Sequence, residues 1–165
     1  MSHKVVTFGE IMLRLAPYDY LRLAQADKYQ ATFGGGEANV AVSLAMFGNE
    51  VQYVTKLPAN PVADAALASV HKYGVKTDHV ARGGDRMGIY FLEHGASVRP
   101  SKVTYDRANT AISQVTLEDF DWLSIFKGVK WFHTTGITPA LSSESAEVTL
   151  QAAKAAKAAG VTVSC

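Results

Sequence analysis

Short apolar runs alternate with helical patterns along most of this chain, and that alternation limits the possible fold more than any other feature. Strands joined by helices pair in parallel, because each helix returns the chain to the same end of the sheet. We therefore expect an α/β fold with a doubly wound, mostly parallel sheet. Its strands are predicted at residues 4–8, 51–56, 129–133 and 161–165.

Four helices are expected between these strands. The segment 38–47 is apolar nearly all round, so this helix should be buried on most sides. The second helix begins at Asn60-Pro61, because Asn suits the N-cap and Pro suits the first helical position. The other two are expected from Thr116 to about Gly128 and from Ser142 or Ser143 to Gly160.

Two segments, at about 11–33 and 88–106, do not alternate with helices. We expect them to form a small antiparallel sheet that projects from the main one, with a hairpin between strands 88–93 and 98–106. The strand predicted at 161–165 should be central, and a parallel sheet left there exposes an edge. Residues 1–165 are therefore expected to be the N-terminal part of a longer domain.

Composition excludes several classes of function. Sixteen basic and fifteen acidic side chains give a net charge of +1, which indicates neither a nucleic-acid nor a membrane-surface partner. No stretch approaches the roughly 20 apolar residues that span a bilayer. Cys165 is the one cysteine, so no disulfide forms within a chain, as is typical of the cytoplasm. The five histidines lack metal-ligand spacing, and no metal site is expected.

Residues 33–48, Phe-Gly-Gly-Gly-Glu-Ala-Asn followed by an apolar run and Gly48, indicate a binding site. Glycine allows another molecule to approach the backbone closely, and the free N–H groups at the helix start would face it. On these residues alone, two simpler interpretations are equally compatible. The glycines can form a plain turn, and Asn39 can cap its helix. The run matches neither a dinucleotide-binding fingerprint nor a phosphate-binding P-loop.

These residues also resemble the ribokinase-like sugar kinases, or phosphofructokinase-B family. Gly34-Gly35, Asn39 and Gly48 match the family's N-terminal signature. Glu37 replaces the usual small residue or proline and is typical of one branch, the 2-keto-3-deoxygluconate kinases. Three further segments resemble that branch in the same order: a lid strand at 88–91, a Tyr-x-Arg strand at 103–107 and a strand-end loop at 133–141.

Two departures from the family accompany this resemblance. The Gly-Asp pair that usually follows the second strand is replaced by Leu57-Pro58-Ala59-Asn60-Pro61. The second signature, a Gly-Ala-Gly-Asp that carries the catalytic base and the anion hole, is absent. The resemblance therefore implies that the base and most of the ATP and Mg²⁺ sites lie beyond residue 165. No catalytic residue is expected within this chain, which alone would be inactive.

The resemblance implies an ATP-dependent kinase that phosphorylates a keto-deoxy sugar acid, 2-keto-3-deoxygluconate, at a primary hydroxyl. The planar fork of an arginine suits a carboxylate, and tyrosines offer a flat face and a hydroxyl. The projecting sheet would act as a lid that excludes water, and its exposed edges favour a homodimer. The expected substrate-binding residues are Gly35, Asn39, Tyr90, Tyr105, Arg107 and Ile137.

Two alternatives remain open from the sequence. A kinase for a neutral sugar such as fructose or ribose would gain nothing from Arg107 in binding its acceptor. A non-catalytic sugar-binding or assembly module would also be compatible with a chain that lacks the base and the nucleotide site. Without the resemblance, Arg107 would be interpreted as a solvated surface cation, and Tyr90 and Tyr105 as packing residues.

Overall fold

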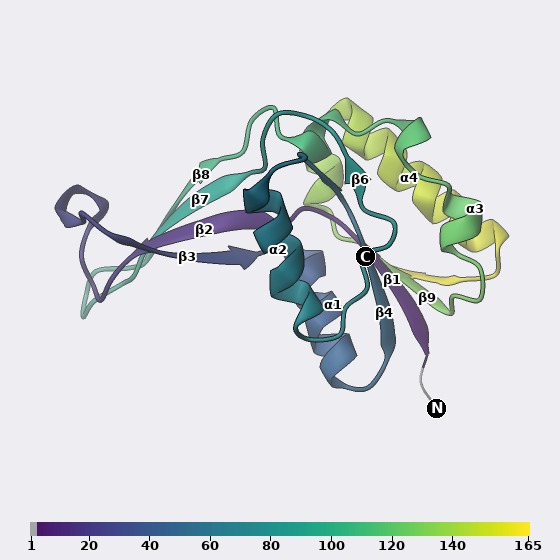
Figure 1. The fold of residues 1–165 in the computed structure, drawn as a ribbon, viewed down its shortest axis with the longest axis horizontal. Coiled ribbons are helices and arrows are strands. Elements are labelled where there is room, and N and C mark those ends of the chain that lie inside the picture. Colours follow the sequence, from purple (N-terminus) through teal and green to yellow (C-terminus); the bar gives the residue numbers. More distant parts are fainter. Residues whose placement is uncertain (1–2) are drawn as a thin grey trace.

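The computed structural model describes residues 3–165, in which helices cover both faces of a four-stranded sheet (Figure 1). The strand order is β10-β9-β1-β4 and all neighbours pair in parallel. The predicted doubly wound parallel sheet is therefore confirmed. Its strands are β1 (Lys4–Phe8), β4 (Glu50–Val54), β9 (Trp131–His133) and β10 (Thr162–Ser164).

Helices α1 (Gly36–Met46) and α2 (Pro61–His71) lie on one face of this sheet, and α3 (Trp122–Ile125) and α4 (Ser143–Ala158) lie on the other (Figure 1). The predicted caps are present. The Asn60 side chain accepts a hydrogen bond from the Ala63 N–H at 2.9 Å, and the Ser142 hydroxyl accepts one from the Ser145 N–H at 3.0 Å. No helix within residues 3–165 is both long and apolar enough to cross a bilayer.

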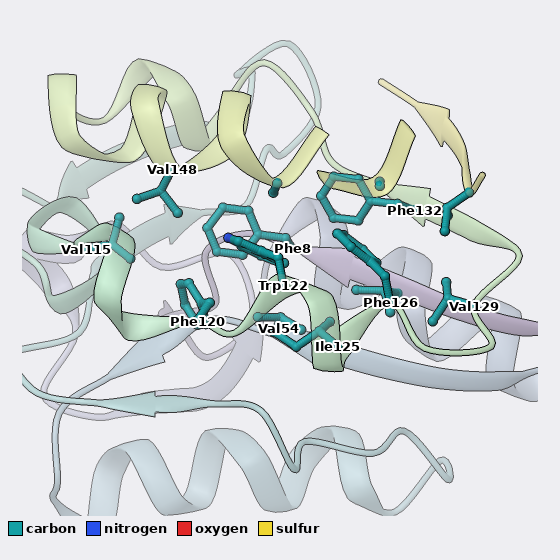
Figure 2. Packing of buried hydrophobic residues seen from close by; sticks show 14 of the residues in the cluster. Phe8, Val54, Val115, Phe120, Trp122, Ile125, Phe126, Val129, Phe132 and Val148 are labelled. Atoms are coloured by element: carbon teal, nitrogen blue, oxygen red, sulfur yellow. The ribbon is translucent and has the colours of Figure 1, made fainter. Parts of the chain in front are cut away.

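Aromatic side chains hold α3 and α4 against β1 and β9 (Figure 2). The Trp122 ring lies edge-on to Phe8, with centroids 5.4 Å apart, and stacks on Phe126 at 5.5 Å. Phe132 of β9 meets both Trp122 and Phe126. Each such pair contributes about 0.5–1.5 kcal/mol beyond its buried area.

The prediction of one helix from Thr116 to about Gly128 is wrong, because this segment forms two short, separate helical turns instead. A 3₁₀ turn spans Leu117–Asp119, Phe120 is extended, and α3 then begins with Asp121 as its cap. The Asp119 carboxylate accepts from both the Thr116 N–H and the Lys56 ammonium, which closes the first turn. Phe120 then packs edge-on against Phe8, and this contact interrupts the helix.

A second four-stranded sheet, here called the lid sheet, projects to the left in Figure 1 with the order β3-β2-β7-β8. The β2–β3 and β7–β8 pairs are antiparallel as predicted, but the central β2–β7 pair is parallel, so the sheet is mixed. The reason is the connection, since the chain passes through α1 and α2 between β2 and β7. The strands are β2 (Met12–Pro17), β3 (Tyr29–Gly34), β7 (Ile89–Glu93) and β8 (Lys102–Asp106).

The remaining elements are short. The predicted strand 51–56 divides, and its end pairs in a separate two-stranded sheet. The predicted strand 98–106 begins later than expected, because Val98 lies in a turn and is 98% exposed. These elements are β5 (Lys56–Leu57), β6 (Ala81–Arg82) and 3₁₀ turns at Leu23–Gln25, Ala111–Gln114 and Thr138–Ala140.

The expectation that the first helix is buried on most sides is wrong. Only Glu37, Ala38 and Ala41 of α1 are buried, whereas Met46 is 69% exposed. One side of α1 packs on β4 and β1. Leu44, on another side, lines an open cavity of about 590 Å³ beside β9 and β10.

Gly35 lies at the junction between β3 and α1, where two backbone segments meet closely. Its φ of −171° is ordinary extended backbone, so conformational strain does not require glycine here. Space does, because a Cβ at Gly35 would lie 2.0 Å from the carbonyl oxygen of Glu10. The missing side chain thus lets the start of α1 lie against the segment that follows β1.

We predict that Gly35→Ala lowers the free energy of unfolding by about 1–3 kcal/mol, because a new methyl group must push the two backbone segments apart. Urea unfolding of the purified protein measures this change.

Gly36→Ala is the matched control, since the nearest atom to its new Cβ would be Ile137 Cδ1 at 3.9 Å. Its stability should stay within about 0.5 kcal/mol of the starting protein or rise slightly, because alanine favours helix. Equal stability of the two variants would contradict the close contact at Gly35.

Candidate functional site

One cavity of about 220 Å³ lies where the end of β1, the start of α1, the lid sheet and the loop after β9 meet. Residues from four separate parts of the chain line it, so the fold brings them together. All six predicted binding residues are among them: Gly35, Asn39, Tyr90, Tyr105, Arg107 and Ile137. Their roles in binding stay predictions.

Asn39 lies in the first turns of α1 and its side chain is available to a ligand. The N-cap of the helix is Gly35, with no side-chain cap, so the alternative that Asn39 caps its helix is wrong. The Asn39 N–H donates to the Gly35 carbonyl at 2.9 Å as part of the helix. Among residues 3–165 its side-chain amide has no hydrogen-bond partner, and it can both donate and accept toward hydroxyl groups.

Glu37 is buried and holds the loop after β9 against α1. Its Oε1 accepts from the Thr135 N–H at 3.1 Å and from the Thr135 hydroxyl at 2.6 Å. The Thr135 hydroxyl oxygen in turn accepts from the Ile137 N–H at 3.2 Å. Gly9 provides the room, since a Cβ there would lie 2.3 Å from the Glu37 carboxyl group. These contacts place Ile137 at the wall of the cavity.

The lid sheet presents two tyrosines to the cavity. Tyr90 of β7 and Tyr105 of β8 are directly opposed across the antiparallel pair, with ring centroids 6.0 Å apart and planes inclined by 41°. Val103 follows the same two-residue alternation and also lines the cavity. Since Tyr105 is 57% exposed, its ring offers an open apolar face.

Arg107 follows β8 and is held in place, so its interpretation as a solvated surface cation is wrong. Its Nη2 donates to Oε2 of Glu10 in a close ion pair between residues 97 positions apart. Its guanidinium carbon also lies 5.3 Å from the centre of the Tyr105 ring, a cation–π contact.

Glu10 is the buried partner in this pair, and its side chain is only 3% exposed. Burial raises the pKa of Glu10, and this effect outweighs the opposing influence of Arg107. The Glu37 carboxylate raises the pKa of Glu10 further. Two buried carboxyl groups and one guanidinium therefore lie together at the carboxyl end of a central strand.

Sequence reasoning missed Glu10, Met12, Glu37 and Val103 as lining residues of this cavity. A signal for Glu10 was present, because it directly follows the predicted strand 4–8 and Gly9. Open α/β sheets bind ligands beyond the carboxyl ends of their strands. Met12 and Val103 carried no comparable signal, since apolar strand residues are usually packing residues.

The cavity can bind a small polar molecule, but it holds no evident metal site. Within residues 3–165, no cluster of three or more His, Cys, Asp or Glu side chains is arranged to hold an ion. The groups that it offers are a guanidinium, an amide, two phenols and helix N–H groups. Such groups recognise carboxylates and hydroxyls.

Three relatives illustrate what this chain is similar to. A 2-dehydro-3-deoxygalactonokinase of Haloferax volcanii is 34% identical over 98% of this chain and 51% of its own length. The crystal structure of a 2-dehydro-3-deoxygluconokinase from Thermotoga maritima is 58% identical with a TM-score of 0.97, over 99% of this chain and 50% of that one. A fructokinase from Xylella fastidiosa with bound ATP is 25% identical with a TM-score of 0.85, over 99% of this chain and 51% of that one.

The chain thus spans about half the length of these relatives. Its similarity nevertheless extends over nearly all of its own residues and includes every segment that lines the cavity. Residues 2–165 match the family described as pfkB family carbohydrate kinase. The chain therefore belongs to the pfkB family of carbohydrate kinases.

Proposed function

We propose that this chain forms the acceptor-binding part of an ATP-dependent kinase for a keto-deoxy sugar acid, 2-keto-3-deoxygluconate. The observation that carries the proposal is Arg107, a partly buried cation held by an ion pair in a cavity that two tyrosines also line. The names of two relatives, a 2-dehydro-3-deoxygluconokinase and a 2-dehydro-3-deoxygalactonokinase, support the same class of acceptor.

Each group in the cavity has a role in this proposal. Arg107 pairs with the carboxylate of the acid, because a guanidinium can donate two parallel N–H bonds to it. Tyr90 and Tyr105 pack against the carbon chain, and Asn39 binds its hydroxyls. Gly35 and Ile137 border the cavity. The primary hydroxyl would then be presented for phosphorylation.

Phosphoryl transfer requires a held acceptor, a base and positive charge near the moving group. The described residues supply the acceptor site. We propose that the base, an aspartate, and the sites for ATP and Mg²⁺ lie in a part of the protein outside residues 1–165, and that this chain alone is inactive. ATP supplies the γ-phosphoryl group when it is bound.

Two further parts of the proposal concern the surroundings of the site. The lid sheet excludes water from the cavity, which favours phosphoryl transfer to the sugar over hydrolysis of ATP. The protein works in the cytoplasm, where its exposed free thiol at Cys165 stays reduced.

A kinase for a neutral sugar such as fructose is the second candidate. One observation favours it, since Arg107 already forms an ion pair with Glu10 and the two charges largely cancel. The fructokinase among the relatives agrees with this candidate. The two candidates differ in whether Arg107 contributes to binding of the acceptor.

We predict that the intact protein, as its gene encodes it, phosphorylates 2-keto-3-deoxygluconate with ATP. Arg107→Ala should raise KM for this acid about tenfold or more, because a hydrogen bond to a charged group contributes roughly 1.5–3 kcal/mol. A coupled assay of ADP release measures both the turnover and the KM for the acid. The control is Arg82→Ala, which breaks an ion pair with Asp64 outside the cavity and should leave KM unchanged.

An unchanged KM in Arg107→Ala would refute the role of Arg107 and favour the neutral-sugar candidate. Turnover of fructose or ribose in preference to the acid would do the same. If the protein binds the acid but transfers no phosphoryl group to any acceptor, the non-catalytic binding module becomes the better description.

We also propose a homodimer through the lid sheet. Its outer strands β3 and β8 have free edges, which favour pairing with a second copy. The face opposite the tyrosines is apolar, since Leu15 and Phe91 are register partners there and Tyr29 lies edge-on to Phe91 at 6.5 Å. An apolar face on a projecting sheet is typical of an interface.

Light scattering after gel filtration should therefore give twice the mass of one chain. Tyr29→Lys should shift the mass toward that of the monomer, because a charge is costly in an apolar interface. Tyr73→Lys is the control at another exposed tyrosine, at the end of α2, and should remain dimeric. A monomeric starting protein would contradict the proposal.

A further inference from the structure

The ion pair between Glu10 and Arg107 connects the two sheets of the molecule. Glu10 follows β1 of the main sheet, whereas Arg107 follows β8 of the lid sheet. A long, flexible side chain on the end of an edge strand would otherwise sample many rotamers. The carboxylate of Glu10 restricts Arg107 to one of them.

Glu10 itself has little freedom to move. It is 3% exposed, and its Oε1 lies beside Gly88, just before β7, since a Cβ at Gly88 would be only 2.8 Å from that oxygen. Its carbonyl oxygen is fixed by the close contact with Gly35. The carboxylate that holds Arg107 is therefore attached to backbone that packs closely against Gly35.

The contacts of Arg107 determine which of its nitrogens a ligand can reach. Nη2 already donates one hydrogen to Glu10, and Nε is buried with no partner among the described residues. The remaining donors are the two N–H groups of Nη1 and the second N–H of Nη2. One N–H from each of these two nitrogens, the free edge of the guanidinium, can together bind a carboxylate at two points.

We propose that Glu10 is a positioning residue for Arg107, which presents this free edge to the carboxylate of an acidic acceptor and so sets the preference for a sugar acid over a neutral analogue. The inference rests on the proposed function of the cavity and adds to it the residue that determines acid specificity. Glu10 lines the cavity, but in this proposal it acts on the acceptor through Arg107.

The stability of the protein does not account for this pair. Burying two opposite charges costs desolvation energy that their attraction often fails to recover, and apolar replacements of such pairs are often neutral or stabilising. The raised pKa of Glu10, caused mainly by burial, agrees with a carboxyl group held in an unfavourable environment. The position of Glu10 beside the cavity therefore indicates a role in ligand binding.

The test compares KM for 2-keto-3-deoxygluconate with KM for the corresponding carboxamide, which has the same shape without the charge. In Glu10→Leu, Arg107 loses its anchor, so KM for the acid should rise about tenfold while kcat and KM for the carboxamide change little. Glu10→Gln keeps an acceptor for Nη2, so it should restore the preference for the acid. Glu50→Gln, which alters the exposed ion pair with Lys76, is the control and should change neither KM.

Glu10→Leu leaves the Arg107 charge buried without its partner and can fail to fold. The double variant Glu10→Leu with Arg107→Met removes both charges and avoids this difficulty. Its KM for the acid should be no higher than that of Arg107→Met alone, because Glu10 makes no favourable contribution to acid binding once Arg107 is gone. A further rise in KM would show that Glu10 acts independently and would overturn the proposal.

The outcomes separate this inference from the proposed function. If the starting protein does not phosphorylate the sugar acid, the proposed function fails. If it does, and Glu10→Leu keeps the full preference for the acid over the carboxamide, only the role of Glu10 fails.

Discussion

The buried ion pair between Glu10 and Arg107 is the contact on which the arrangement of the candidate site depends. It joins the carboxyl end of β1 to the end of β8, and so sets the lid sheet against the main sheet beside the cavity. The hydrogen bonds from Thr135 to Glu37 hold the third wall, the loop after β9. Two acidic side chains, one after β1 and one in α1, thus organise a cavity that other residues of α1, the lid sheet and the loop after β9 also line.

Glycine is the other requirement of this arrangement. Carboxyl groups and backbone segments can meet at the end of β1 only where neighbouring residues lack a side chain. Gly9 leaves room for the Glu37 carboxyl group, and Gly88 leaves room for that of Glu10. Gly35 leaves room for the backbone itself. Gly35, which was predicted to admit a ligand, therefore serves first to let the protein pack against itself, and the approach of a sugar to it stays a prediction.

Much of this fold could be predicted from the sequence, because the main sheet and most of its helices depend on local signals. Strand 4–8 is a mostly apolar run, and Asn60-Pro61 and Ser142 are strong local caps. The six candidate residues were named through ordered motifs, and the structure places them around one cavity. The predictions that were wrong concern segments whose structure depends on contacts far along the chain. Phe120 is extended and packs against Phe8, which interrupts the predicted helix, and β2 pairs with β7 in parallel because two helices separate them.

The role of Glu10 could not be predicted from the sequence, because it too depends on a contact between residues far apart in the chain. An acid after a strand is ordinary, and only the fold shows that Arg107, 97 positions later, pairs with it.

The most direct test of this account is a crystal structure of the intact protein with 2-keto-3-deoxygluconate. We expect the sugar between α1 and the lid sheet, with its carboxylate about 2.7–3.2 Å from Nη1 of Arg107 while Nη2 stays on Glu10. A sugar bound elsewhere, or one whose carboxylate does not meet Arg107, would contradict the account.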